Sequence, residues 1–385
     1  MVNFNLKTKY LFGKNSIAGL STELKNHTYK RALILYGQGS VVRNGILAKL
    51  KEVLTSINLS YIEFSGIEPN PRDTTLDKCV SFCKEHEVDV IFALGGGSVV
   101  DASKVIGALV TNPQYIRTWD YVLDPSRVTN NSLDIISIIT LAGTGSENNA
   151  GSVITNQELN EKKGVQTPSA VPIITVEDPS YTFTVNAWQT ASGIFDCFSH
   201  LLEQYFTKSL FTWTKEYIFA NLRVLINYAK TVVLRPDHYD ARANILWTTS
   251  MSLNGLATFN SDSDWTVHVI EHAFSGLWDI THGAGLALIT PTYLKVRSDK
   301  EKWFKDKVIE LGRNVFKTET FEATISYLVQ FIKSINLPTK WTDFKEIEKF
   351  ESEEAEFLIN HSTKFGDPEL AEIYRDVIYK IKGAI

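Results

Sequence analysis

The sequence has few cysteines, no long apolar run and no excess of basic charge. Only three cysteines occur in 385 residues, and the spacing of Cys79 and Cys83 is neither a C-x-x-C redox motif nor a zinc knuckle. A disulfide framework is therefore not expected, and a reducing compartment fits. No apolar segment is long enough to span a bilayer, and the first residues lack the apolar stretch of a signal peptide. We expect a cytoplasmic protein without a membrane partner.

The net charge argues against nucleic acid as a partner. A formal net charge of −5 gives no electrostatic reason to expect nucleic acid. The hydrophobic content of 44% and charged content of 22% are those of a globular protein. A chain of this length suggests two domains.

The first half of the chain alternates short apolar runs with segments of helical spacing. This alternation predicts a doubly wound α/β domain over residues 1–179. From about Asn186 onward helical spacing dominates, which predicts an all-α domain over residues 180–385. Strands are expected at 32–36, 60–64, 88–94, 135–140 and 172–176, and helices at 41–54, 73–85, 187–206, 213–229, 240–256 and 265–277.

A glycine-rich segment, Gly95-Gly96-Gly97-Ser98, follows one expected strand and opens a helix. Doubly wound folds bind anions at this position, because glycine lets backbone N–H groups approach a phosphate at a helix N-terminus. The segment is neither a G-x-G-x-x-G fingerprint nor a Walker loop, so a kinase or ATPase is disfavoured. The alternative is a tight turn in which Ser98 and Asp101 form a capping box.

Two further loops support a dinucleotide. Residues 140–147 (TLAGTGSE) follow a strand and offer hydroxyls and glycines; the alternative is a flexible surface turn. The loop 37–40 contains no acid for the ribose 2′-hydroxyl, whereas Ser40 offers a hydrogen bond and Arg43 lies one turn on. This favours NADP(H) over NAD(H).

Four of the eight histidines and one aspartate in the second half of the chain occur at spacings typical of metal-binding helices. Asp196 and His200 are spaced to share one helix face, as are His268 and His272, and His282 follows a short break. Imidazole and carboxylate groups are ligands for Fe²⁺ or Zn²⁺. The alternative is a set of local helix contacts, because the sequence does not give distances in space.

Taken together, these motifs resemble the iron-containing (group III) alcohol dehydrogenase family, and most closely its butanol dehydrogenase and NADPH-dependent aldehyde reductase branch. The matching segments run in one order along most of the chain: YGQGSVVRNG (36–45), EPNPRDTTL (68–76), GGGSVVDASKVIG (95–107), TLAGTGSENNAGSVIT (140–155), VEDPSYTFTV (176–185), FDCFSHLLEQY (195–205) and HVIEHAFSGLWDITHGAGLA (268–287).

The resemblance implies an active-site cleft between a dinucleotide-binding domain and a helical domain. It also implies the following roles: metal ligands Asp196, His200, His268 and His282; a proton relay outside the ligand set, His272; phosphate contacts Gly96, Gly97, Ser98 and Asp101; and nicotinamide-side contacts Thr140, Thr144, Ser146 and Lys162. To the cofactor site we add Gly37, Gln38, Gly39, Ser40 and Asn149. The NADP-preferring branch usually has two glycines where this chain has Gln38-Gly39, and Glu271 has no assigned family role.

The expected activity is the interconversion of a primary alcohol and its aldehyde, with one divalent metal and NADP(H). Alternatives on the same fold are a glycerol dehydrogenase, a dehydroquinate-synthase-like enzyme and a catalytically silent nucleotide-binding protein. His268–His272 also spells H-x-x-E-H, the signature of a class of zinc peptidases. Asn149 and four tryptophans (Trp119, Trp188, Trp265, Trp278) are candidates to shape the pocket, although core packing is the default role of aromatics. The alternating segment 4–12 is a candidate strand for pairing between the subunits of a homodimer.

Overall fold

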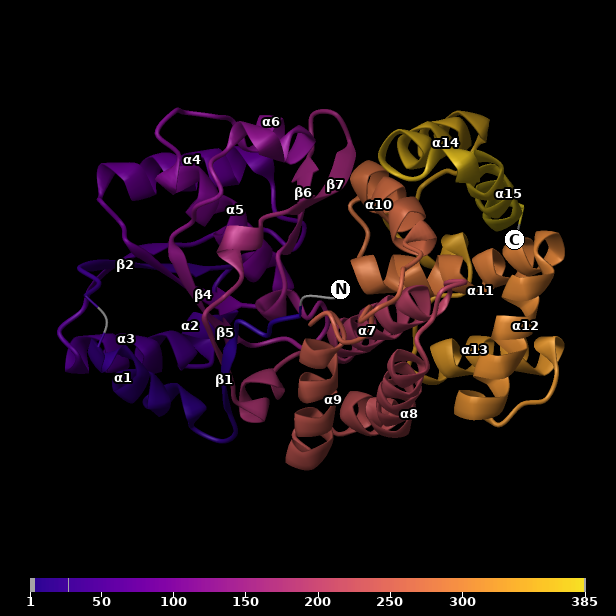
Figure 1. Cartoon of the computed structure of the whole chain (residues 1–385), viewed down its shortest axis with the longest axis horizontal. Helices are drawn as coiled ribbons and strands as arrows, with labels where there is room; N and C mark the ends of the chain where they lie inside the picture. Colours follow the sequence, from indigo (N-terminus) through magenta and orange to yellow (C-terminus); the bar gives the residue numbers. More distant parts are fainter. Residues whose placement is uncertain (1–3, 27, 384–385) are drawn as a thin grey trace. The chain divides into compact units, whose positions relative to one another are not determined.

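The computed structural model describes residues 4–26 and 28–383 (Figure 1). The chain is divided into two compact units. The α/β unit consists of Asn5–Val185 together with Pro236–Asn254, and the helical unit consists, among the described residues, of Phe4, Asn186–Arg235 and residues 255–383.

The α/β unit is built on a parallel sheet of six strands in the order β1-β8-β5-β4-β2-β3. Two further strands, β6 and β7, form a separate antiparallel pair that the sequence pattern did not indicate. The bounds are β1 Lys9–Phe12, β2 Arg31–Tyr36, β3 Ser60–Phe64, β4 Val90–Gly95, β5 Asp134–Ile139, β6 Gly151–Asn156, β7 Glu161–Gln166 and β8 Ile174–Glu177.

Both faces of the sheet are covered, which explains why its strands are continuously apolar rather than alternating. In β2, Leu33 and Leu35 belong to one buried cluster, and Ala32 and Ile34 belong to another on the opposite face. The first cluster includes side chains of α4, α5 and α6, and the second includes side chains of α1 and α3. The ribbon places α4, α5 and α6 on one side of the sheet and α1 and α3 on the other (Figure 1). The helices of this unit are α1 Leu20–Glu23, α2 Ser40–Arg43, α3 Ile46–Ser56, α4 Asp73–Glu85, α5 Gly97–Thr111, α6 Thr118–Leu123 and α9 Tyr239–Met251. The predicted doubly wound α/β fold is confirmed.

The strand order creates a topological switch point between β2 and β4. The chain runs from β2 outward to β3, returns to β4 on the other side of β2, and then continues in the opposite direction to β5 and β8. In open α/β sheets, ligands bind outside the carboxyl ends of the strands at such a point. The loop that follows β2 and the loop that follows β4 are the two segments 37–40 and 96–98.

One local prediction was wrong, and one alternative that the sequence left open does not occur. The helix expected at 41–54 is divided into α2 and α3, because Asn44-Gly45 interrupts it and Gly45 has a φ of 76°. The capping box of Ser98 and Asp101 does not form: α5 has Gly96 at its N-cap with no side-chain cap hydrogen bond. The Asp101 carboxylate instead accepts hydrogen bonds from the Ser146 hydroxyl and from the backbone N–H of Val153.

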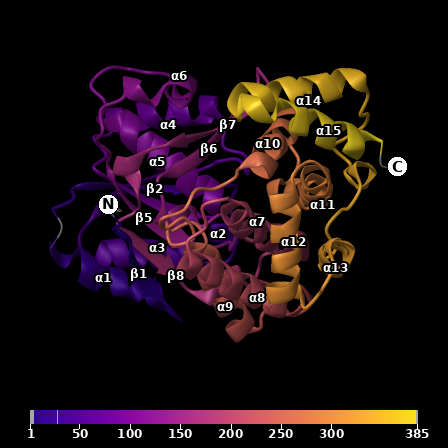
Figure 2. The ribbon, with the colours of Figure 1, turned by 45° about the vertical axis from the view of Figure 1, so that its right-hand side comes forward.

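The helical unit confirms the predicted all-α region. Its helices are α7 Ala187–Tyr205, α8 Thr212–Leu234, α10 Thr266–Trp278, α11 His282–Lys300, α12 Lys302–Leu311, α13 Phe321–Ser334, α14 Ser352–Phe365 and α15 Ala371–Lys382. Within this unit α7 packs against α8 and α11, and α10 packs against α11 and α14 (Figure 2). Among the helices in the described parts of the chain, none is long and apolar enough to cross a membrane.

Helix α9 groups with the α/β unit, although it follows α8 in the sequence. A buried hydrogen-bond network explains this placement: the Ser250 hydroxyl lies 2.5 Å from Oε1 of Glu147 and 2.5 Å from Oε1 of Glu177. The apolar periodicity of α9 in the sequence does not predict a contact between Ser250 and these two glutamates. The domain boundary expected at residue 179 stays a prediction.

Candidate active site

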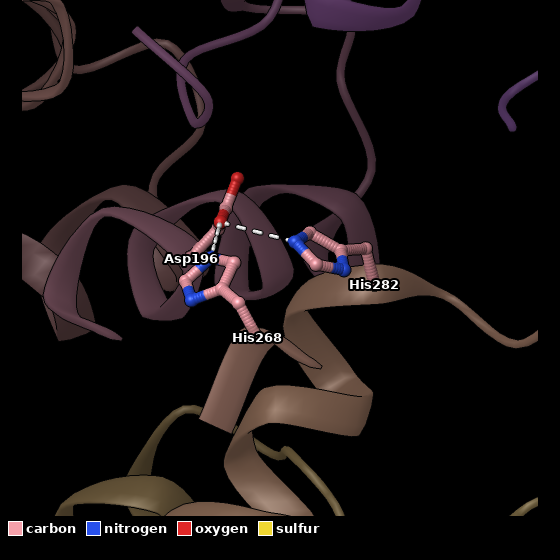
Figure 3. A group of neighbouring side chains, drawn as sticks. All are labelled: Asp196, His268 and His282. Atoms are coloured by element: carbon pink, nitrogen blue, oxygen red, sulfur yellow. Dashed lines mark ion pairs between the residues drawn. The ribbon is translucent and has the colours of Figure 1, made fainter. Parts of the chain in front are cut away.

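The helical unit brings the predicted metal ligands together around one carboxylate oxygen. Oδ1 of Asp196 lies 3.2 Å from Nε2 of His200, 3.6 Å from Nε2 of His268 and 3.5 Å from Nε2 of His282. Figure 3 shows Asp196 with His268 and His282. Asp196 and His200 lie one turn apart on α7, His268 is on α10, and His282 is the first residue of α11. The rings of His200 and His268 stack with centroids 4.7 Å apart.

These donor atoms suit one divalent ion. Ligand atoms about 2.1 Å from an ion in tetrahedral arrangement stand roughly 3.4 Å apart, which is close to the three distances measured from Oδ1 of Asp196. The ligand atoms of Asp196, His268 and His282 also lie within 4.8 Å of one another, whereas His200 does not belong to that group. Oδ1 of Asp196 and Nε2 of His268 are buried and have no hydrogen-bond partner among the described residues. Buried polar atoms normally have a hydrogen-bond partner. Both of these atoms can donate a lone pair, so a bound cation would satisfy them. The residues therefore fit the Fe²⁺ or Zn²⁺ expected from the sequence, and their atoms do not discriminate between the two.

Burial and neighbouring charges shift the pKa values of Asp196, His200 and His268 in different directions. Burial raises the pKa of Asp196, but the surrounding histidines outweigh it and hold the pKa below its usual value. Burial lowers the pKa of His200 to about 3, which keeps that imidazole neutral. Burial also lowers the pKa of His268, but the carboxylates of Glu203 and Asp196 outweigh it and raise the pKa to about 10. Asp196 and the neutral Nε2 of His268 would hold a metal, which requires that this nitrogen carry no proton.

Two glutamates lie behind the histidines: Glu203, which the sequence analysis did not single out, and Glu271, to which it gave no role as a histidine partner. Nδ1 of His268 lies 2.5 Å from Oε1 of Glu203, and Nδ1 of His282 hydrogen-bonds Oε2 of Glu271. Both glutamates are buried, with 1% and 0% of their surface exposed. Because each carboxylate takes the Nδ1 side of its ring, the Nε2 atoms are left to face Asp196. The available signal was spacing: Glu203 lies two turns beyond Asp196 on the same helix.

His272 lies beside this group and not within it. Its ring centroid is 5.6 Å from that of His282 and 6.2 Å from that of His268. The intervening Glu271 is engaged with His282 and the Ser275 hydroxyl, so it is not placed as the free base of an H-x-x-E-H peptidase. Among the four tryptophans, Trp265 lies against the site, with its ring 5.3 Å from that of His268.

In the α/β unit, the predicted cofactor residues gather at the carboxyl edge of the sheet. Gly96 is the N-cap of α5 and Gly97 its first residue, and Thr140 directly follows β5. The backbone N–H of Thr140 donates to Gly95, and a Cβ on Gly97 would lie 2.3 Å from the Thr144 side chain. The glycine-rich turn and the 140–149 loop are therefore in close contact, and Gly97 allows it.

The loop after β2 carries the remaining predicted contacts, Gly37, Gln38, Gly39 and Ser40. Gly39 has a φ of 98°, which favours glycine, and a Cβ built there would lie 3.7 Å from Nη1 of Arg43. The guanidinium thus lies next to this loop. Lys162, buried in β7, donates to Asn70 at 3.1 Å in the loop that follows β3.

A buried lysine outside the predicted set holds the 140–149 loop. Nζ of Lys104 donates to the Ser146 hydroxyl at 2.7 Å, to Oδ1 of Asn149 at 3.3 Å and to the backbone oxygen of Gly151 at 2.6 Å. Burial lowers the pKa of Lys104 to about 8, although Asp101 and Glu147 oppose the shift. The polar groups of Asp101, Ser146 and Asn149 thus form hydrogen bonds within the protein, and these bonds fix the shape of the loop.

Comparison with known proteins identifies the family. The family model described as iron-containing alcohol dehydrogenase matches residues 7–179, and the model of the C-terminal region of the Fe-containing alcohol dehydrogenase family matches residues 190–380. The chain belongs to the iron-containing alcohol dehydrogenase family and is an oxidoreductase of that class.

The relatives bear the names expected for the predicted branch. NADH-dependent butanol dehydrogenase B of Clostridium acetobutylicum is 41% identical over 322 residues, which are 82% of this chain and 80% of that protein. NADPH-dependent aldehyde reductase YqhD of Escherichia coli is 32% identical over 353 residues, 89% of each chain. The crystal structure of NADH-dependent butanol dehydrogenase A from Thermotoga maritima has a TM-score of 0.91 at 28% identity and covers 99% of this chain and 98% of its own. The cofactor named therefore differs among the relatives.

Proposed function

We propose that this protein interconverts a primary alcohol and its aldehyde, working mainly in the direction of aldehyde reduction, with NADP(H) and one divalent metal. The observation that carries the proposal is the convergence of three imidazole Nε2 atoms on Oδ1 of Asp196. When bound, the metal supplies Lewis acidity toward the carbonyl oxygen, and the reduced nicotinamide supplies the hydride.

In this proposal the protein supplies the binding groups and the proton. Asp196, His200, His268 and His282 hold the metal, with the imidazoles in their neutral form. His272, beside the cluster, delivers a proton from its ring to the product oxygen, since an imidazole nitrogen can hold a proton and release it. The names of the relatives, butanol dehydrogenase and aldehyde reductase, support a small aldehyde or alcohol as substrate.

The α/β unit binds the cofactor in this proposal. The backbone N–H groups at the start of α5 bind the pyrophosphate, because a helix N-terminus is electropositive and Gly96 and Gly97 have no side chain in the way. The loop from Thr140 to Asn149, with Lys162, forms the nicotinamide side. Ser40 and Arg43 recognise the 2′-phosphate, which is the basis for preferring NADP(H), while relatives of both preferences exist.

The quaternary structure belongs to the proposal as well. β1 is an edge strand, and Phe12, at its end, is 42% exposed beside Trp247 of α9, with ring centroids 5.2 Å apart. An open strand edge flanked by exposed aromatic rings suits pairing with a second copy, so we propose a homodimer. Of the segment 4–12 in which a strand was expected, only Lys9–Phe12 is one.

A substrate panel tests the proposal directly. Protein purified without oxygen is mixed with NADPH or NADH and with aldehydes from two to six carbons, and oxidation of the cofactor is followed. We expect turnover with the short and medium aldehydes and a lower KM for NADPH. Absence of turnover with every aldehyde and alcohol, with metal bound, would refute the proposed reaction.

A further inference from the structure

The Glu203 carboxylate makes contacts with the backbone of α10 in addition to its hydrogen bond to the His268 ring. The residue lies on α7, one turn beyond His200, and is 1% exposed. Its carboxylate reaches across to the first turn of α10: Oε2 accepts from the backbone N–H of Val267 at 2.8 Å and of His268 at 3.2 Å. Its other oxygen, Oε1, lies 2.5 Å from Nδ1 of His268.

These contacts act as a helix cap supplied by another helix. The first N–H groups of an α-helix have no partner within it, and the residue at the N-cap of α10, Trp265, makes no side-chain cap hydrogen bond. A carboxylate at this end satisfies those donors and interacts favourably with the helix dipole. The backbone oxygen of Glu203 also accepts from the N–H of Asp264 at 2.8 Å. One residue therefore fixes the start of α10 against the helix that carries Asp196 and His200.

The same carboxylate determines which ring nitrogen of His268 is free to coordinate a metal. A carboxylate only accepts hydrogen bonds, so Nδ1 of His268 carries the proton and Nε2, 3.6 Å from Oδ1 of Asp196, keeps the side that a metal needs. His200 lacks this arrangement, because its Nδ1 is buried and has no hydrogen-bond partner among the described residues. His282 has it through Glu271, but that carboxylate comes from α10, the helix that also carries His268.

We propose that Glu203 is a positioning residue for the metal site: it selects the Nδ1–H form of His268 and holds α10 in register with α7. This inference rests on the metal-dependent function proposed above. It assigns to one buried glutamate the coupling of the two helices that provide Asp196, His200 and His268. Glu271 orients a single histidine, so its loss should affect the site less.

Glu203→Gln is the matched test, because it preserves the size of the side chain and reverses one hydrogen bond. The glutamine oxygen still accepts from the N–H groups of Val267 and His268, which leaves its amide NH₂ facing Nδ1. An NH₂ group donates to Nδ1, so the ring proton moves to Nε2, where it opposes coordination. Removing such an outer carboxylate typically costs roughly 10–100-fold in metal affinity.

The measurement is the affinity of the whole protein for Zn²⁺ and Co²⁺, obtained by competition with a chelator. We expect a loss of roughly 10–100-fold for Glu203→Gln and a smaller loss for Glu271→Gln. Glu310→Gln is the control, since Glu310 lies in the same unit and binds Tyr205 and Lys215 outside the site. Equal affinity of Glu203→Gln and the unaltered protein would overturn the inference while leaving the proposed function intact. Failure of the unaltered protein to bind either metal would instead overturn the proposed function.

A second measurement needs no variant and covers the case in which Glu203→Gln does not fold. In the Co²⁺-loaded protein, the ring N–H protons of ligand histidines give shifted proton NMR signals that disappear on exchange with D₂O. Because Nδ1 of His268 is hydrogen-bonded to Glu203, whereas the buried Nδ1 of His200 has no partner among the described residues, we expect the His268 signal to exchange more slowly than that of His200. Exchange of the His268 signal as fast as that of His200 would contradict the inference.

Discussion

Nε2 of His282, at the first residue of α11, lies 3.5 Å from Oδ1 of Asp196 in α7. This approach depends on the glycine that follows the histidine. A Cβ on Gly283 would lie 1.9 Å from the backbone oxygen of Ser192, so the two helices meet backbone to backbone. A backbone atom cannot move aside as a flexible side chain can.

Gly283→Ala should therefore displace the start of α11 and separate His282 from Asp196. We expect a loss of stability of about 1–3 kcal/mol, as for other overpacked sites, together with weaker metal binding. Urea unfolding and metal analysis measure the two effects. Gly164→Ala is the control, because a Cβ there would meet only the Ser152 oxygen at 3.9 Å. Unchanged stability and metal content in Gly283→Ala would show that the helices are not in this contact.

Arg43 provides a test of cofactor choice. If its guanidinium binds the 2′-phosphate, Arg43→Gln should raise the KM for NADPH by roughly 10-fold, the effect of losing one charged hydrogen bond at an exposed site, and leave the KM for NADH unchanged. Steady-state kinetics with both cofactors give the comparison. Lys49→Gln, which removes a cation in α3 that lies over the Tyr181 ring, serves as the control. An unaltered NADPH-to-NADH ratio in Arg43→Gln would refute the assignment of this residue.

The buried pair of Glu147 and Glu177 predicts a pH-dependent stability. Burial, followed by the nearby Glu147 carboxylate, raises the pKa of Glu177 well above its ordinary value of 4.5. The folded protein therefore keeps a proton that the unfolded chain releases, so the free energy of unfolding falls as the pH rises above about 4.5 toward the raised pKa.

Glu177→Gln should remove that part of the fall, because an amide does not titrate. Urea unfolding at several values between roughly pH 5 and 8 measures the slope, and we expect a flatter profile for the variant. Glu63→Gln is the control: Glu63 is a partly exposed glutamate of β3 paired with Lys51. Identical slopes for Glu177→Gln and the unaltered protein would exclude this pair as a source of pH dependence.

The edge strand β1 predicts the oligomeric state. Light scattering should give twice the 43.3 kDa of one chain, and Phe12→Lys should shift the protein toward the monomer because a charge at a strand edge opposes pairing. Tyr115→Lys controls for the added charge, since Tyr115 is 62% exposed and lies far from β1 in the sequence. A monomeric unaltered protein would rule out the proposed dimer.

Local patterns in the sequence predicted those features that depend on local physics. The strand at 60–64 and the helix at 73–85 were expected with the bounds that the structure has, because their apolar periodicity and flanking residues are local. The break at Gly45 and the β6–β7 pair were missed, since a left-handed glycine and a short antiparallel pair leave weak signals.

Features that depend on packing could not be predicted. Asp196 and the histidines were identified by type and spacing, but spacing along the chain contains no distance between α7, α10 and α11. Glu203 and Glu271 are invisible as partners of His268 and His282 until those helices are packed. The assignment of α9 to the α/β unit likewise depends on Ser250 meeting Glu147 and Glu177, which lie far away in the sequence.

The central claim is that Asp196 and its three histidines hold a metal on which aldehyde reduction depends. The most direct test is to purify the unaltered protein and Asp196→Ala under anaerobic conditions, and to measure metal content and aldehyde-dependent NADPH oxidation on the same samples. We predict one divalent ion per chain and turnover in the unaltered protein, and loss of both in Asp196→Ala, with the fold retained by circular dichroism. Full turnover by Asp196→Ala without bound metal would contradict the account.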